Sequence, residues 1–158
     1  MELTFGLDLF DLIEYISYTE VHREKRRDSQ RKNQKMQLNN LTEKIIGCAI
    51  EVHKQLGPGL LESAYEECLA FEISRSSLRF ERQYPVPVIY KDIKLDYGYR
   101  IDLLVENLVV VELKAVECIN PVHEAQILTY MKFSNKEIGL LINFNVLLLK
   151  EGLKRFVF

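Results

Sequence analysis

The sequence predicts an α/β protein in which helices cover both faces of a central mixed sheet, a three-layer α/β/α arrangement. Two observations indicate this fold class. Residues 38–158 show the order helix, strand, strand, strand, helix, strand, which is αβββαβ. The segment from Leu108 to Val116 is almost wholly apolar, as expected of a central strand covered on both faces. The chain has 158 residues, 47% of them hydrophobic, so one domain can bury a core without disulfides.

Residues 1–37 are predicted to form an N-terminal extension outside that domain, which comprises residues 38–158. Residues 3–18 carry apolar side chains at helical spacing and predict an amphipathic helix in an acidic stretch. Residues 22–35 carry seven Lys or Arg against two acidic residues. We expect this basic stretch to be a solvated helix or a disordered tether. Two alternatives stay open: a basic arm for nucleic acid, or pairing with the acidic helix of a second copy.

Two helices are expected at the start of the compact domain. Asn40 and Glu43 have the spacing of a capping box, which predicts a helix over residues 41–55. The segment Gly57-Pro58-Gly59 ends that helix, because proline cannot continue the hydrogen bonds and glycine tolerates positive φ. A second helix is expected over residues 60–74.

The later elements alternate between strand and helix patterns. They are strands over 80–90, 97–105 and 108–116, a helix over 121–133, and strands over 138–143 and 153–158. Pro85 and Pro87 place the first of these strands at a sheet edge. Pro121 suits the first turn of the helix, where no hydrogen-bond donor is needed.

Two charged residues interrupt the most apolar strand. Glu112 and Lys114 are two residues apart and therefore lie on one face of the strand. An isolated charge in such a place costs several kcal/mol, so buried charges are paired, bound to a metal or neutralised. A simple ion pair between these two residues is the structural alternative to a functional site.

The hairpin before this strand adds a third charge to the same face. A three-residue loop over residues 105–107 would pair Asp102 with Val110 and make it a diagonal neighbour of Glu112, roughly 7–8 Å away at the backbone. Asn107 favours this loop, because asparagine tolerates the left-handed conformation needed at its third position. A two-residue turn would point Asp102 away from Glu112.

Two carboxylates and a lysine on one face predict a metal site. The oxygens of Asp102 and Glu112 suit Mg²⁺ or Mn²⁺, which also accept phosphate oxygens as ligands. Lys114 would position the attacking water or offset developing charge. This set can support attack of a metal-bound water on a substrate phosphate group.

The motif formed by Asp102, Glu112 and Lys114 resembles the active-site signature of the PD-(D/E)xK nuclease superfamily, whose restriction-endonuclease-like core has the αβββαβ order. The segment Gly59–Tyr65 also resembles the pattern that names the GxxExxY proteins, a bacterial family assigned to that superfamily. The resemblance covers about residues 38–158. It implies a metal-dependent nuclease that hydrolyses phosphodiester bonds of nucleic acid.

The resemblance also implies roles for further residues. Glu62 holds the place of a helix glutamate that often completes the metal site in this superfamily. Gln126 and Tyr130 match the Gln-x-x-x-Tyr pair of the RecB-like branch, and a spacing of four places them on one helical face. Ile101 departs from the nominal motif, which has proline before the aspartate.

The same considerations set expectations for partners. DNA is favoured over RNA as the substrate, and a second copy or another protein is an expected partner. The alternative function is a catalytically silent nuclease-fold module for binding or regulation.

The net charge of −2 excludes a uniformly basic nucleic-acid coat protein. The chain has no apolar run near the roughly 18 residues that cross a bilayer. The acidic N-terminus is unlike a signal peptide, so we expect a cytoplasmic protein without membrane contact.

Overall fold

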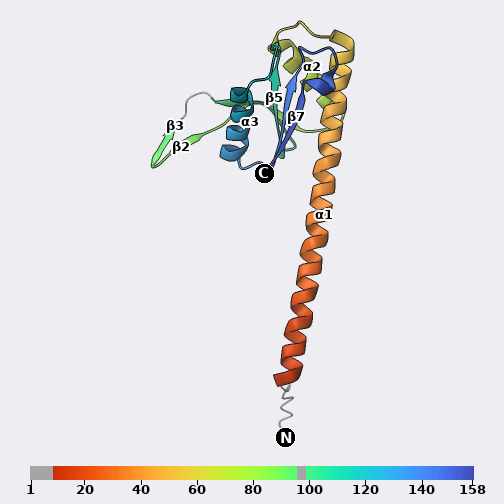
Figure 1. The fold of residues 1–158 in the computed structure, drawn as a ribbon, viewed down its shortest axis with the longest axis vertical. Coiled ribbons are helices and arrows are strands. Elements are labelled where there is room, and N and C mark those ends of the chain that lie inside the picture. Colours follow the sequence, from red (N-terminus) through yellow and green to blue (C-terminus); the bar gives the residue numbers. More distant parts are fainter. Residues whose placement is uncertain (1–8, 96–98) are drawn as a thin grey trace. The chain divides into compact units, whose positions relative to one another are not determined.

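A computed structural model describes residues 9–95 and 99–158, with side chains from residue 23 onward (Figure 1). Contacts within the chain divide it into two units, Met1–Asn39 and Asn40–Phe158. Residues 3–8 of the predicted N-terminal helix lie outside the described residues.

The first helix, α1, is much longer than predicted. It spans Leu9–Leu56, 48 residues, and includes residues from both units. The expected helix start with a capping box at Asn40 and Glu43 is therefore wrong, since both lie inside α1. The physical reason is the absence of a helix breaker: between its ends α1 contains no proline and one glycine, Gly47. Residues 23–35 of the basic stretch are helical, and all their side chains are exposed.

The second unit contains a mixed five-stranded sheet with the order β1-β4-β5-β6-β7. Its strands are β1 (Phe80–Pro85), β4 (Arg100–Val105), β5 (Val109–Lys114), β6 (Ile138–Asn143) and β7 (Leu153–Val157). β5 and β6 are parallel, and the other neighbours are antiparallel. Helix α3 (Pro121–Ser134) connects the two parallel strands, helix α2 (Glu62–Arg75) precedes β1, and a short helix η1 (Leu149–Glu151) precedes β7. This arrangement confirms the predicted α/β fold class.

Both faces of the central strands are buried. On one face, Leu104, Val110 and Leu141 pack with Ile127 and Tyr130 of α3. The side chains on the other face are also fully buried, and they comprise Leu103, Val111 and Leu140. Figure 1 shows α2 and α3 on opposite sides of the sheet. The burial explains why β5 is apolar along its whole length except at two positions.

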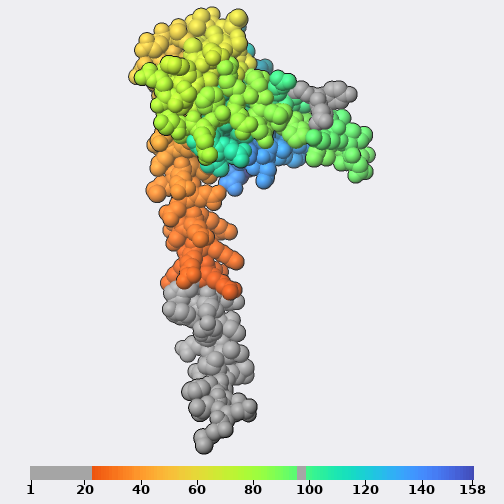
Figure 2. Space-filling view, turned by 180° about the vertical axis from the view of Figure 1, so that it is seen from behind, coloured from red at the N-terminus to blue at the C-terminus, as the bar shows by residue number. Residues whose placement is uncertain are grey.

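The predicted strand over residues 80–90 is two strands in different sheets. β1 ends at Pro85, whereas β2 (Val88–Tyr90) pairs with β3 (Ile93–Leu95), which the sequence did not predict. The division falls at Pro87, which cannot donate to a ladder. Lys91 is left-handed and turns the chain from β2 into β3. The β2–β3 hairpin projects from the rest of the second unit, as Figure 2 shows in green. The edge position of β1 is confirmed.

The β4–β5 hairpin has a three-residue loop, but its register differs from the predicted one. Val105 pairs with Val109 and Leu104 with Val110, so the expected pairing of Asp102 with Val110 is wrong by two residues. A shift of two keeps every side chain on its predicted face, whereas a shift of one would have reversed it. Asp102 therefore shares a face with Glu112, as expected.

The loop conformation explains the shift. Both Glu106 and Asn107 are left-handed, with φ of 51° and 55°. Glu106 is held in this unusual conformation by Arg79, which binds its carboxylate at 2.9 Å and accepts its backbone N–H at 2.8 Å. The long-range pair with Arg79 stabilises a turn that local preferences alone would not select.

Candidate active site

Asp102 of β4 and the Glu112–Lys114 pair of β5 converge at the carboxyl end of β5. The Lys114 ammonium donates to Glu112 Oε1 at 2.6 Å, so the ion pair that the structural alternative predicts is present. Asp102 Oδ2 accepts the backbone N–H of Leu113 at 2.8 Å. The structure thus brings together the three charges that the sequence singled out.

Burial gives these charges unusual acid–base properties. The Glu112 side chain is almost fully buried, and burial together with the nearby Asp102 charge raises its pKa to about 7 despite the bond to Lys114. Burial likewise raises the pKa of Asp102 to about 6, against the opposing effects of the Leu113 N–H and Lys114. Burial lowers the pKa of Lys114, but its bond to Glu112 and the surrounding carboxylates outweigh that effect and raise it overall.

The second carboxylate oxygen of Glu112, Oε2, is the most unusual polar atom of the site. Oε2 is buried and has no hydrogen-bond partner among the residues that the structure describes. An unsatisfied buried carboxylate oxygen is costly, and a hard cation with oxygen ligands would satisfy it. In the described part of the chain, no three His, Cys, Asp or Glu side chains are already arranged to hold a metal ion. The carboxylates of Asp102 and Glu112 are oxygen ligands of the kind that a divalent cation prefers. Lys114 already binds Glu112 Oε1, so Oε2 is the oxygen of Glu112 that is available to a cation.

Glu62 lies close enough to influence all three charged residues. It is the first residue of α2, and its charge raises the pKa values of Asp102, Glu112 and Lys114. The predicted helix glutamate is thus placed beside the site by the turn that starts α2.

The Gly-x-x-Glu-x-x-Tyr pattern describes how that turn is built. Gly59 has a φ of 106°, a conformation that other residues rarely adopt. The buried Tyr65 hydroxyl donates to Gly57 O at 2.6 Å and accepts the Leu60 N–H at 3.1 Å. Tyr65 therefore holds the glycine turn against α2. Glu62 lies between Gly59 and Tyr65 in the chain, so these two residues fix its position.

Two polar residues of the site were missed by the sequence prediction. Glu66, one helical turn after Glu62, is buried and binds Arg82 at 2.9 Å. The Gln83 amide donates to Glu66 Oε2 at 2.8 Å and to Asp102 Oδ1 at 3.4 Å. Gln83 has a φ of 50° within β1, a strained conformation of the kind often found at functional sites. The spacing of four from Glu62 could have indicated Glu66, but no local signal indicated Gln83.

Gln126 and Tyr130 form a pair on α3 beside the charged cluster. The Gln126 amide donates to the Tyr130 hydroxyl at 2.9 Å. Burial raises the pKa of Tyr130, and the charges of Asp102, Glu112 and Lys114 also act on it. The shared helical face was predicted correctly. His123, one turn earlier, instead caps α3 by accepting the Asn120 N–H with Nδ1.

The segment after Lys114 is held by a third residue that the sequence prediction missed. The buried Asn143 side chain donates to Val116 O at 2.8 Å and accepts the Val116 N–H at 3.1 Å. Phe144 N donates to Lys114 O at 2.9 Å. These contacts fix the backbone from the carbonyl of Lys114 to Val116, because β5 and β6 are parallel and end together.

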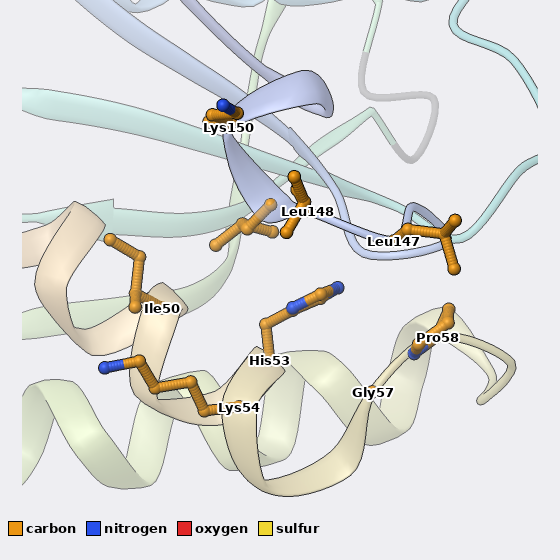
Figure 3. Close-up of a pocket in the computed structure, with 9 residues that line it drawn as sticks. Ile50, His53, Lys54, Gly57, Pro58, Leu147, Leu148 and Lys150 are labelled. Atoms are coloured by element: carbon orange, nitrogen blue, oxygen red, sulfur yellow. The ribbon is translucent and has the colours of Figure 1, made fainter.

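A cavity of about 450 Å³ lies between the end of α1 and η1 (Figure 3). His53 projects into it, and its Nε2 lies 2.8 Å from Val146 O. Lys54 and Lys150 lie on its rim, and Leu147 forms part of its wall. None of the candidate site residues lines this cavity.

Comparison with known proteins gives one match. The family model described as "PD-(D/E)XK nuclease superfamily" matches residues 39–156, about three quarters of the chain. No curated protein and no solved structure shows a significant match to the chain.

Proposed function

The chain belongs to the PD-(D/E)XK nuclease superfamily, and we propose that it is a divalent-metal-dependent nuclease that hydrolyses phosphodiester bonds of DNA. The observation that carries this proposal is the unsatisfied, buried Oε2 of Glu112 beside Asp102 and Lys114. We further assign the chain to the GxxExxY group of bacterial proteins and to the RecB-like branch. The geometry of Gly59–Tyr65 and the Gln126–Tyr130 pair support these finer assignments.

Each charged residue has a role consistent with its position. Asp102 and Glu112 would hold Mg²⁺ or Mn²⁺, and Glu62 would add a third carboxylate. When bound, the cation would polarise the substrate phosphate and lower the pKa of a coordinated water. Lys114 would donate a hydrogen bond to the attacking water and offset negative charge in the transition state. Its bond to Glu112 keeps the ammonium charged and oriented.

The α3 pair supports the substrate side of the site. The amide of Gln126 and the hydroxyl of Tyr130 are neutral donors, and both lie near the carboxylates without adding negative charge. They would hydrogen-bond to phosphate oxygens of the bound strand. Gln83 would keep Asp102 and Glu66 apart by donating to both carboxylates.

Cleavage of labelled single-stranded and duplex DNA with Mg²⁺ or Mn²⁺ tests the proposal. Asp102→Asn and Lys114→Ala are expected to lower the cleavage rate by about 100-fold or more. The matched controls are Asp92→Asn and Lys150→Ala, which change exposed residues outside the site and should leave the rate unaltered. Circular dichroism would show that all four variants are folded. Equal cleavage by Lys114→Ala and the unaltered protein would overturn the assignment.

A binding or regulatory module is the second candidate. The observation that favours it is the ion pair itself, because Lys114 already neutralises one oxygen of Glu112. This candidate predicts nucleic-acid binding without metal-dependent cleavage, and Asp102→Asn would then change binding or stability only.

A further inference from the structure

A cavity of about 380 Å³ lies directly beside the Gln126–Tyr130 pair. Its lining includes Tyr99, Phe133 and Thr129 in addition to the pair itself. Gln126 and Tyr130 therefore line the cavity and also lie near the charges of Asp102, Glu112 and Lys114. A ligand in this cavity would therefore contact the same pair that is proposed to bind the substrate phosphate.

We infer that this cavity binds an unpaired nucleobase of the substrate strand. The inference rests on the proposed function and defines its substrate class as single-stranded nucleic acid or a duplex with an extruded base.

The charge of the lining favours a base over a phosphate. None of the described residues that line the cavity is charged, and the N–H groups of Val122 and His123 in the first turn of α3 already donate to Asn120 Oδ1. Protein sites for phosphate use Lys, Arg or free N–H groups at helix N-termini. A nucleobase is neutral and flat. It would stack on the rings of Tyr99, Tyr130 or Phe133, and such stacking does not depend on sequence.

The polar groups of the cavity can recognise the edge of a base. The Thr129 hydroxyl both donates and accepts, and the Gln126 carbonyl oxygen is left to accept because the amide nitrogen donates to Tyr130. In a duplex the Watson–Crick edge of each base is already occupied. Entry into the cavity therefore requires an unpaired base, or extrusion of a paired base from the duplex.

The size and position of the cavity are also suitable. A volume of about 380 Å³ falls within the range of small-ligand sites, which are largely apolar with a few polar groups. The cavity lies between α3 and the segment that contains Val86 and Val88. The backbone hydrogen bond from Val86 N to Tyr99 O lies beside it. A strand whose phosphate lies at Asp102 and Glu112 could place a neighbouring base there.

Cross-linking tests the inference without depending on cleavage. A single-stranded oligonucleotide containing 5-iododeoxyuridine would be bound without metal and irradiated, and the attached peptides mapped by mass spectrometry. We expect attachment at Tyr99, Tyr130 or Phe133. Attachment only at other aromatic residues, or no binding of the oligonucleotide, would overturn the inference.

Affinity measurements on two variants give a second test. Tyr99→Ala removes a ring that is 50% exposed, and Ala125→Leu fills the cavity from an exposed helix position, so neither is expected to unfold the protein. Each should weaken single-strand binding about 5- to 150-fold in fluorescence anisotropy. The control Phe71→Ala removes a similarly exposed ring on α2, which is 58% exposed and outside the cavity, and should bind normally.

The outcomes separate this inference from the proposed function. Loss of binding in both variants, with cleavage still dependent on Lys114, supports both. Normal binding by Tyr99→Ala and Ala125→Leu overturns the base cavity and leaves the nuclease proposal standing. Cross-linking in the cavity without any metal-dependent cleavage supports the base cavity and rejects the nuclease proposal.

Discussion

The carboxylate of Asp102 accepts the backbone N–H of Leu113 at 2.8 Å. The ladder between β4 and β5 runs from Val105–Val109 to Leu103–Val111, so this side-chain bond continues the connection where the backbone pairing stops. It fixes Asp102 Oδ2 and leaves Oδ1 in contact with Gln83. The bond also holds a half-buried carboxylate at a position where ionisation is unfavourable.

Asp102→Asn is expected to stabilise the metal-free protein at pH 8. Burial raises the pKa of Asp102 from 3.8 to about 6, so the folded state favours the protonated form, and stability falls as pH rises from about 4 to about 6 and stays level above that. The asparagine avoids this cost, and its amide oxygen can still accept the Leu113 N–H. Urea unfolding should show a gain of about 1–2 kcal/mol at pH 8 and almost none at pH 4.

Asp92→Asn is the control for this measurement, since Asp92 is exposed. Its stability should follow that of the unaltered protein at both pH values. A loss of stability in Asp102→Asn at pH 8 would show that the charged form is favoured in the fold and would contradict the expectation.

Binding of Mg²⁺ or Mn²⁺ should strengthen as pH rises. Protons compete with the cation for Asp102 and Glu112, whose pKa values are about 6 and about 7. Titration calorimetry should show an affinity that rises by up to about tenfold per pH unit for each proton displaced, and levels off above about pH 8. An affinity that does not change over this range would mean that the cation binds elsewhere.

Tyr65→Phe should destabilise the protein and lower cleavage. The substitution keeps the ring, which stacks on Phe144 at 4.5 Å, but leaves Gly57 O and the Leu60 N–H without their partner. We expect a loss of about 1–3 kcal/mol in thermal or urea unfolding. Cleavage should also fall, because this turn positions Glu62. Tyr90→Phe, at an exposed tyrosine, is the matched control and should change neither quantity.

Gly152→Ala should be strongly destabilising, whereas Gly47→Ala should not. A Cβ at Gly152 would lie 2.2 Å from the backbone oxygen of Asn143, which cannot move without disturbing the segment after Lys114. A Cβ at Gly47 meets no atom within 4 Å, and alanine favours a helix by about 1 kcal/mol. Unfolding experiments on both variants should therefore give changes of opposite sign. Similar stability of Gly152→Ala and the unaltered protein would contradict the backbone contact.

The basic stretch, residues 22–35, is expected to add affinity for nucleic acid. Replacing Arg26, Arg27 and Arg31 with glutamine should weaken DNA binding at low salt and reduce the slope of affinity against salt, by up to about 0.9 per lost phosphate contact. The control replaces three exposed lysines of the second unit, Lys44, Lys91 and Lys132. If the slope of affinity against salt is the same in the arginine variant and in the unaltered protein, the basic stretch does not contact DNA phosphates.

Periodic patterns in the sequence predicted the features that depend on local geometry. Glu112 and Lys114 share a face because side chains alternate along a strand, and Gln126 meets Tyr130 because residues four apart adjoin on a helix. The α/β class followed from the element order and the apolar β5. The turn before α2 followed from Gly57 and Gly59, which are both left-handed.

Features that depend on distant partners were decided by the tertiary structure. Arg79 stabilises the left-handed Glu106 and so moves the hairpin register by two residues. Gln83 joins Asp102 to Glu66, although these residues belong to three different elements.

The sequence by itself determined which side chains share a face, because the periods of helix and strand are fixed by backbone geometry. Only the tertiary structure decided which of them meet across elements. Glu112 Oε2 is buried and has no hydrogen-bond partner within the described residues. Glu62 lies beside the carboxylates, and Asn143 pairs with Lys114 across β5 and β6 and binds the Val116 backbone. The reason is that such contacts depend on how strands and helices pack, and no short-range pattern along the chain encodes that packing.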